Sequence, residues 1–227
     1  MVNGIATRFL SGRLKYYGLS LVLSFVTALP AGAMDEEANE SLAPPPVTPK
    51  TFLWIQDPYT GESVRTFVRE PDQSLWNATR IEDYENSLQA EFAPALGVLT
   101  IEKLTIQVPV FNGTDELTLD RGAGRIKGMA KMNGGGNLGI SGHRDGFFRG
   151  LKDIETGDDI LIQTPQGVEK FVVSDINIVP KTDVSVLDPT TDRTLTIVTC
   201  YPFYFVGNAP KRFIVTAIPH QAAPAVD

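Results

Sequence analysis

The sequence predicts an all-β fold, a barrel or a sandwich, and two observations carry this prediction. From Val98 onward, apolar residues recur with a period of two, in short runs separated by turns that contain glycine or proline. Before these runs, one stretch shows the period of a helix. With 227 residues, of which 42% are hydrophobic, the chain can bury one sizeable core and carry a short extra segment.

The net charge of −7 excludes nucleic-acid binding as the function. Nucleic-acid-binding domains present a basic face, and the sequence contains no cluster of Lys and Arg with aromatic residues between them. We therefore expect no nucleic acid among the partners.

The N-terminus predicts export from the cytoplasm. Basic residues precede an uncharged run from Tyr16 to Met34, and acidic residues follow it. The basic flank favours the cytoplasmic side, which places the rest of the chain outside the inner membrane. As a helix the run spans roughly 28 Å, close to the thickness of a bilayer core, and Ala31-Gly32-Ala33 also fits a signal-peptidase site. Residues 1–34 are interpreted as a single-pass anchor or a cleaved signal.

A proline-rich stretch from Asn39 to Lys50 follows and is typical of an extended spacer. Thr51 to Glu70 mixes aromatic residues with turn formers, which fits either a hairpin or an arm that packs on the domain. We interpret residues 35–70 as spacer and arm, 71–220 as the folded domain and 221–227 as a tail.

The helical pattern lies in SLWNATRIEDYENSLQAEF, residues 74–92. Its apolar residues recur at spacings of three and four and are expected to pack on the core: Leu75, Ala78, Ile81, Tyr84, Leu88 and Phe92. Asp72 or Ser74 is expected to cap its start, and Pro94 follows its end.

The strand patterns come next along the chain. VLTIEKLTIQVPVF predicts two strands with a turn near Glu102 and Lys103, and DDILIQTPQGVEKFVVSDINIVP predicts a strand pair around Pro165 to Gly167. Single strands are expected in GNLGISGH (136–143), TLTIVTC (194–200) and RFIVTAI (212–218).

Cys200 is the one cysteine of the chain and ends a run typical of a buried strand. It has no partner for the disulfide that export would favour. It also lies far from the end of the N-terminal apolar run, which excludes lipoprotein acylation. Two interpretations stay open from these facts: a small buried apolar residue, or a reactive thiol.

The chain has two histidines. His220 lies in a tail rich in proline and alanine and is expected to be exposed and without function. His143 ends a short strand and is flanked by glycine. If its strand end meets that of Cys200, the imidazolium would stabilise a thiolate, which is the nucleophilic form. If the last two strands pair in antiparallel fashion, Arg212 returns beside Cys200 and offers charged donors to an oxyanion.

These segments resemble the sortase family, the cysteine transpeptidases of bacterial cell envelopes. The family pattern Thr-Leu-any-Thr-Cys is matched by Thr196-Ile197-Val198-Thr199-Cys200, with isoleucine in place of leucine. The family histidine matches His143 in GHRD, and the family arginine matches Arg212 in KRFIV. The similarity extends from about Ser74 to Ile218, and TCYPF and GHRD are most like class D.

The resemblance implies an eight-stranded β-barrel with one N-terminal helix, short helical turns and the active site at one end. It implies that Cys200 attacks the carbonyl after the threonine of an LPXTG-like sorting signal on another exported protein. His143 would act as general acid and then base, and Arg212 would hold the substrate and stabilise the oxyanion. An amine, from a peptidoglycan precursor or a pilin lysine, would resolve the thioacyl enzyme. Residues 71–220 would then be a catalytic domain on the extracytoplasmic side of the cell membrane.

No cofactor and no metal are expected. Two histidines and one cysteine cannot build a structural zinc centre, and no dense set of oxygen ligands indicates calcium. Asp145 could orient His143, but we assign it to a turn or a surface ion pair.

Two other functions remain open. A peptidoglycan transpeptidase of the L,D type shares the chemistry, but its pattern places histidine and glycine just before the cysteine, and residues 190–199 contain no histidine. An anchored β-domain without enzymatic activity would leave the arrangement of Cys200, His143 and Arg212 as coincidence.

Overall fold

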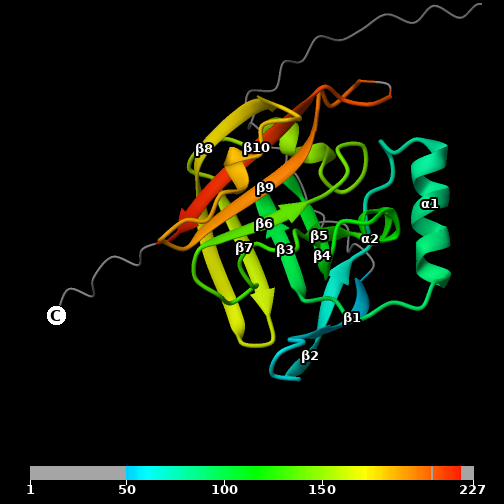
Figure 1. The fold of residues 1–227 in the computed structure, drawn as a ribbon. Helices are drawn as coiled ribbons and strands as arrows, with labels where there is room; N and C mark the ends of the chain where they lie inside the picture. The colour runs from blue at the N-terminus through cyan, green and yellow to red at the C-terminus, as the bar shows by residue number, and fades with distance from the viewer. Residues whose placement is uncertain (1–49, 206, 221–227) are drawn as a thin grey trace, which may run out of the picture. The chain divides into compact units, whose positions relative to one another are not determined.

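The computed structural model describes residues 50–205 and 207–220. Eight strands of this part close into a barrel in the order β10-β8-β7-β3-β4-β5-β6-β9 (Figure 1). Their bounds are β3 Gly97–Ile101, β4 Ile106–Asn112, β5 Ala123–Arg125, β6 Asn137–Ser141, β7 Asp159–Thr164, β8 Gly167–Pro180, β9 Thr194–Tyr201 and β10 Lys211–Pro219. The prediction of an all-β, eight-stranded barrel is confirmed.

Alternating apolar residues fill the barrel, as their period of two predicted. The largest fully buried side chains of its strands include Leu99, Leu138, Ile160, Phe171 and Leu195. The pairs β4–β5 and β6–β9 are parallel, and the other neighbours are antiparallel. The parallel β6–β9 pair matters most for the site, because it brings the ends of two strands together.

The short connections match the predicted turns in two places. A 3₁₀ turn over Glu102–Leu104 separates β3 from β4, and Pro165 and Gln166 join β7 to β8. Further 3₁₀ turns span Arg149–Asp153 and Ser185–Leu187. Between β4 and β6 the chain adds the helix α2 (Glu116–Arg121) and the short strand β5, which no sequence pattern predicted.

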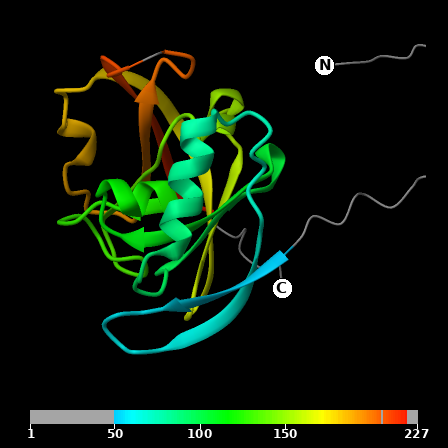
Figure 2. The same cartoon turned by 90° about the vertical axis from the view of Figure 1, so that its right-hand side faces the viewer.

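The segment before the barrel is a β-hairpin of β1 (Lys50–Gln56) and β2 (Ser63–Arg69). Its inner face packs Ile55 and Val68 against the barrel residues Val98 and Phe111. Both interpretations of Thr51 to Glu70 therefore hold, since the segment is a hairpin and it packs on the domain. Figure 2 shows the hairpin below α1.

The helix α1 spans Ala78–Gln89, which is shorter than the predicted 74–92. The Asn77 side chain caps it by accepting a hydrogen bond from the Arg80 backbone N–H at 2.8 Å. The expectation that Asp72 or Ser74 caps the helix is wrong. Asp72 instead accepts from the Ser74 backbone N–H at 2.9 Å, which closes a local turn ahead of the helix.

The apolar stripe of this helix does not form barrel core. Leu75 lies outside the helix and is 62% exposed, and Leu88 is 45% exposed; within α1, Ser87 is the buried residue. Figure 2 shows why, since α1 lies along the outside of the barrel beside α2.

Among the described residues, no helix combines the length and apolar character needed to cross a bilayer. The predicted anchor or signal at 1–34, the spacer up to residue 49 and the tail at 221–227 lie outside the described residues.

Candidate functional site

The ends of β6 and β9 place two of the predicted site residues at one end of the barrel. Beyond the last paired residue of β6, the Gly142 backbone N–H donates to the Val198 carbonyl at 3.2 Å. The Thr199 hydroxyl donates to the Gly142 carbonyl at 2.8 Å in a buried hydrogen bond. Gly142 and Thr199 directly precede His143 and Cys200, so these two bonds hold the histidine and the cysteine next to each other in the fold.

Glycine is required at position 142 for a steric reason. A Cβ there would lie 2.6 Å from a carbon of the Phe148 ring, and Phe148 is fully buried. The turn that follows is closed by the Gly146 and Phe148 backbone N–H groups, which donate to the His143 carbonyl at 3.4 and 3.3 Å. The glycine beside His143 thus lets a buried ring support the histidine turn.

Arg212 reaches the site through the antiparallel pair β9–β10, in which it lies directly opposite Cys200. Directly opposed residues project to the same side of a sheet. The predicted strand pairing is therefore confirmed. The Arg212 guanidinium donates through Nη1 to the carbonyls of Ala209 and Lys211, at 3.3 and 3.0 Å.

His143, Cys200 and Arg212 line one open cleft of about 910 Å³. Cys200 is half-buried, which excludes the interpretation of a fully buried apolar residue. The wall of the cleft combines cationic and aromatic side chains, among them Arg80, Arg144, Arg149, Trp76, Phe203 and Tyr204. No residue of the β1–β2 hairpin lines it. His220, by contrast, is exposed and lies outside the cleft, as predicted.

Arg144 connects the two loops that form the cleft. Its Nη2 donates to the carbonyls of Phe205 and Gly207 at 2.6 and 3.0 Å. On the same wall, the Arg149 guanidinium lies 5.0 Å from the centre of the Tyr204 ring, within the range of a cation–π contact. The loop between β9 and β10 is therefore tied to the histidine loop.

The sequence analysis missed two charged residues beside His143. The Asp120 carboxylate, on α2, lies 3.5 Å from His143 Nε2. Arg80, on α1, pairs with Asp120 through Nη1 and with Asp145 through Nε, the latter at 3.4 Å. Asp145 is thus in an ion pair, as expected for it. Neither α1 nor α2 is near His143 in sequence, and nothing in the local pattern marked Arg80 or Asp120.

These neighbours and the burial of the site shift two pKa values. Burial lowers the pKa of His143, the positive charge of Arg80 lowers it further, and the carboxylates of Asp145, Glu116 and Asp83 oppose both effects. Burial also raises the pKa of Asp120, against the influence of Arg80. A lowered pKa keeps the imidazole of His143 neutral at neutral pH and able to accept a proton.

Glu116, Asp120 and His143 each offer one ligand atom, and these atoms lie within 4.8 Å of one another. Asp120 is already paired with the Arg80 guanidinium. A divalent cation at this position would lie close to that positive charge and be repelled by it. The arrangement is better described as an ion-pair network than as a metal centre.

A thiol, an imidazole and a guanidinium in one cleft can together carry out acyl transfer. The thiolate is a strong nucleophile, the imidazole can move a proton, and a guanidinium can stabilise the oxyanion of a tetrahedral intermediate.

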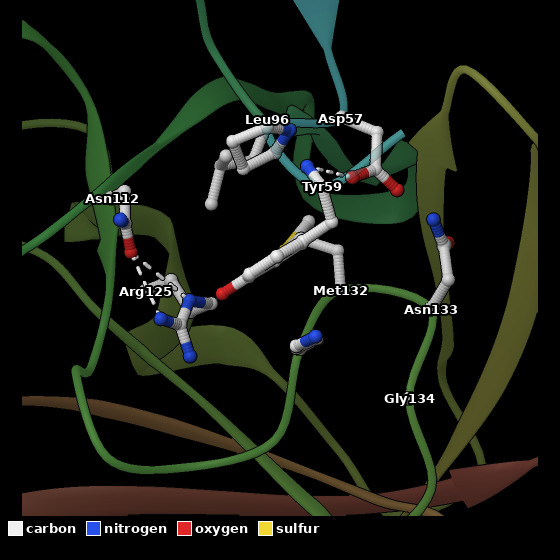
Figure 3. A pocket seen from close by; sticks show the side chains of 10 residues that line it. Asp57, Tyr59, Leu96, Asn112, Arg125, Met132, Asn133 and Gly134 are labelled. Carbon is white, nitrogen blue, oxygen red and sulfur yellow. Dashed lines mark hydrogen bonds between the residues drawn. The ribbon is translucent and has the colours of Figure 1, made fainter. Parts of the chain in front are cut away.

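A second and smaller cavity, of about 200 Å³, lies near the start of β6, at the opposite end of the barrel from His143. Figure 3 shows the Tyr59 ring pointing from the hairpin toward Arg125, which is held by Asn112. This smaller cavity is lined by none of the predicted site residues.

Comparison with known proteins gives consistent results. A family model described as the sortase domain matches residues 99–220. Sortase D of Bacillus subtilis is 34% identical over 159 residues, which cover 69% of this chain and 80% of that protein. Sortase A of Listeria monocytogenes is 28% identical over 109 residues, 46% of this chain and 49% of that protein.

Solved structures agree with this likeness. A Clostridium perfringens sortase D5 transpeptidase superposes with a TM-score of 0.52 at 23% identity, covering 66% of this chain and 93% of that one. A lid mutant of sortase A from Corynebacterium diphtheriae gives a TM-score of 0.53 at 26% identity, with coverages of 65% and 82%.

Proposed function

Because the chain belongs to the sortase family of cysteine transpeptidases, we propose that Cys200, His143 and Arg212 are its catalytic residues. The observation that supports this most is the pairing of Arg212 with Cys200 across β9–β10, in a cleft that His143 also lines. All three positions are matched independently by the family motifs in the sequence.

The reaction follows from these three groups. His143 accepts the proton of the Cys200 thiol, and the sulfur attacks the carbonyl carbon of the substrate peptide bond. Arg212 stabilises the oxyanion that forms. His143 then protonates the leaving nitrogen, the C–N bond breaks, and a thioester remains on Cys200.

The second half of the reaction consumes the thioester. An acceptor amine loses a proton to His143 and attacks the thioester carbonyl, the C–S bond breaks, and a new amide bond forms. Water in place of the amine would give a carboxylic acid, so the outcome depends on how well the cleft excludes water. The Arg144 bonds to the β9–β10 loop shape that cleft.

The substrate that we infer is an LPXTG-like sorting signal of another exported protein, cleaved after its threonine. The acceptor is an amine of a cell-wall precursor or of a pilin lysine. The cleft offers what such a peptide needs, because Phe203 and Tyr204 can contact an apolar side chain while Arg212 can hold a backbone carbonyl.

Sortases act at the cell envelope, and we propose the same location for this chain. Residues 1–34 would hold it at the cell membrane as a single-pass anchor and 35–70 would be spacer and arm. Residues 71–220 would act on the extracytoplasmic side, with 221–227 as a tail. The basic flank ahead of the apolar run supports this orientation.

Intact mass spectrometry tests the proposal directly. The chain has one cysteine, so a thioacyl adduct formed from a panel of LPXT-type peptides has one possible site. We expect an adduct whose mass identifies the accepted peptide, and its conversion to an amide when an amine is added.

The Cys200→Ala variant should form no adduct. Folded wild-type protein that forms no adduct with any peptide, and whose thiol resists alkylation, would contradict the proposal. An adduct that persists in Cys200→Ala would contradict the assignment of the nucleophile.

A further inference from the structure

The helix α1 packs directly on the loop that carries His143. Trp76, just before the helix, and Tyr84 within it both meet Phe147 edge to face, at 5.1 and 5.8 Å between ring centres. The Arg80 stem lies along Gly146, where an added Cβ would be 3.4 Å from Arg80 Cδ. The sortase-domain match begins at residue 99, so α1 contacts the catalytic loop from outside the matched region.

Arg80 is the charged part of this contact. Its side chain is only 12% exposed and faces three carboxylates: Asp120, Asp145 at 3.4 Å and Asp83 at 3.9 Å. The Asp120 side chain is 11% exposed, so this pair is largely shielded from water. Charges in such surroundings interact more strongly than surface ion pairs do.

The histidine contacts the same network through one nitrogen. His143 Nε2 is buried, has no hydrogen-bond partner among the described residues, and lies 3.5 Å from Asp120 Oδ1. Nε2 thus lies toward Asp120 without a hydrogen bond to it, and we infer that Nδ1 is the nitrogen that exchanges protons within the cleft. The partner of one ring nitrogen commonly fixes the tautomer and orientation of a functional histidine.

We propose that Arg80 is a positioning residue for catalysis: from α1 it holds Asp120 and Asp145 beside His143, orients the imidazole and balances the charge around it. The inference rests on the catalytic role proposed for His143. It makes α1 a part of the active site, although the helix supplies no group that reacts.

The charges that shift the pKa of His143 come from three elements, and Cys200 on β9 and Arg212 on β10 line the same cleft. Arg80 and Asp83 lie on α1, Glu116 and Asp120 on α2, and Asp145 on the histidine loop itself. Loss of the Arg80 charge removes one cause of the lowered pKa of His143, so Arg80→Met should raise that pKa. Asp120→Asn leaves Arg80 less compensated and should lower it.

The two substitutions therefore shift the same titration in opposite directions, and the double variant should return it toward the wild type. A residue with a merely structural role would not give this pattern.

The titration can be observed without any activity assay. The chain has two histidines, so the full-length protein gives two imidazole resonances by NMR, and His220→Gln assigns them. We would follow the His143 resonance against pH in the wild type, Arg80→Met, Asp120→Asn and the double variant. An unchanged His143 titration in Arg80→Met, in a protein that is folded, would overturn the proposal.

Arg121→Met provides the matched control. Arg121 also ties α2 to α1, because its Nη1 donates to the carbonyls of Ser87 and Ala90 at 2.5 and 3.2 Å, but no carboxylate at the histidine bonds to it. We expect it to leave the His143 titration unchanged. If it shifts the titration as much as Arg80→Met does, docking of the helix is responsible and the Arg80 charge is not.

Activity adds a second measurement. With a peptide that the wild type cleaves, Arg80→Met should lower kcat about 10- to 100-fold, as expected when a reacting group is misplaced, with KM little changed. The acid limb of its pH–rate profile should move to higher pH with the His143 titration, and Arg80→Lys should recover part of the rate. If no peptide is cleaved even by the wild type, the proposed function fails, while the titration still decides the role of Arg80.

Discussion

The two ends of the barrel differ in how completely their buried arginine and histidine side chains are hydrogen-bonded. At the end shown in Figure 3, Arg125 is 7% exposed, and its donors go to Asn112 Oδ1 and to the carbonyls of Met129 and Ala130. At the cleft, buried nitrogens of Arg80, His143 and Arg149 have no hydrogen-bond partner within the described part of the chain. Buried polar groups are normally paired, so the cleft end is the exception.

The difference supports the proposal that the cleft end binds the substrate. A fully bonded arginine holds loops together and has nothing left to offer a ligand. Buried donors without a hydrogen-bond partner beside an open cleft carry a cost in stability, which is common at functional sites. Arginine is thus fully hydrogen-bonded at one end, and at the other we propose that Arg212 has a chemical role.

Among the substitutions that test this comparison, Arg212→Met should have the largest effect on the catalytic rate. Loss of one donor to an oxyanion lowers kcat about 10²- to 10³-fold. Stability should change little, because the carbonyls that Arg212 bonds lie beside an open cleft and can bond water instead. Single-turnover acylation together with thermal unfolding measures both. A large fall in Tm with unchanged acylation would assign Arg212 a structural role and break the comparison.

Arg125→Met should give the reverse result. The substitution leaves Asn112 Oδ1 and two backbone carbonyls without their donor, which costs about 2–4 kcal/mol of unfolding free energy. The rate per folded molecule should stay at the wild-type value, because the cavity near Arg125 contains no site residue. Denaturant unfolding and acylation of the folded fraction test this. Loss of the rate in fully folded protein would mean that the two ends are coupled.

Most strands of the barrel and the proposed catalytic residues were predictable because their signals are local. Alternation over β7 or β9 and the motif around Cys200 are complete within short segments, and the pairing of Arg212 with Cys200 follows from two adjacent strands. The start of α1 was misplaced because Asp72 and Ser74 look like caps, whereas Asn77 performs that role.

Arg80 and Asp120 were not predictable for a different reason. Their importance depends on where α1 and α2 pack around the histidine loop, and no periodicity within either helix encodes that position. Asp120 is buried at the end of a six-residue helix, which from sequence alone looks like a solvent-facing turn. The residues proposed to react were therefore easier to find than those proposed to position them.

Two glycine-to-alanine substitutions compare how closely the backbone is packed at the two ends of the barrel. Gly142→Ala would bring a methyl group 2.6 Å from the Phe148 ring, so the histidine turn must shift, and we expect kcat to fall about 10- to 100-fold. Gly135→Ala is the control, because a Cβ there meets nothing within 4 Å. Peptide cleavage rates measured on folded protein separate them. Equal rates in both variants would show that the cleft tolerates displacement of His143.

The smallest expected effect is the contribution of His143 to the change of unfolding free energy with pH. The folded protein lowers the pKa of His143, whereas an unfolded chain takes up this proton near pH 6.5. As the pH falls below 6.5, the unfolded state therefore binds more protons, and the wild type loses stability until the pH passes below the folded pKa. The slope is at most about 1.4 kcal/mol per pH unit for one group.

The His143→Asn variant lacks this proton uptake, so its Tm should fall less than that of the wild type between pH 7.5 and 5. Its lost packing contributes an offset that does not depend on pH, which makes the change in the difference between the two curves the quantity to measure. A His220→Asn variant reports what removal of an exposed histidine does to the same curve. Parallel curves for the wild type and His143→Asn would mean that His143 is solvated like a surface residue, and the contrast between the two ends of the barrel would lose its electrostatic basis.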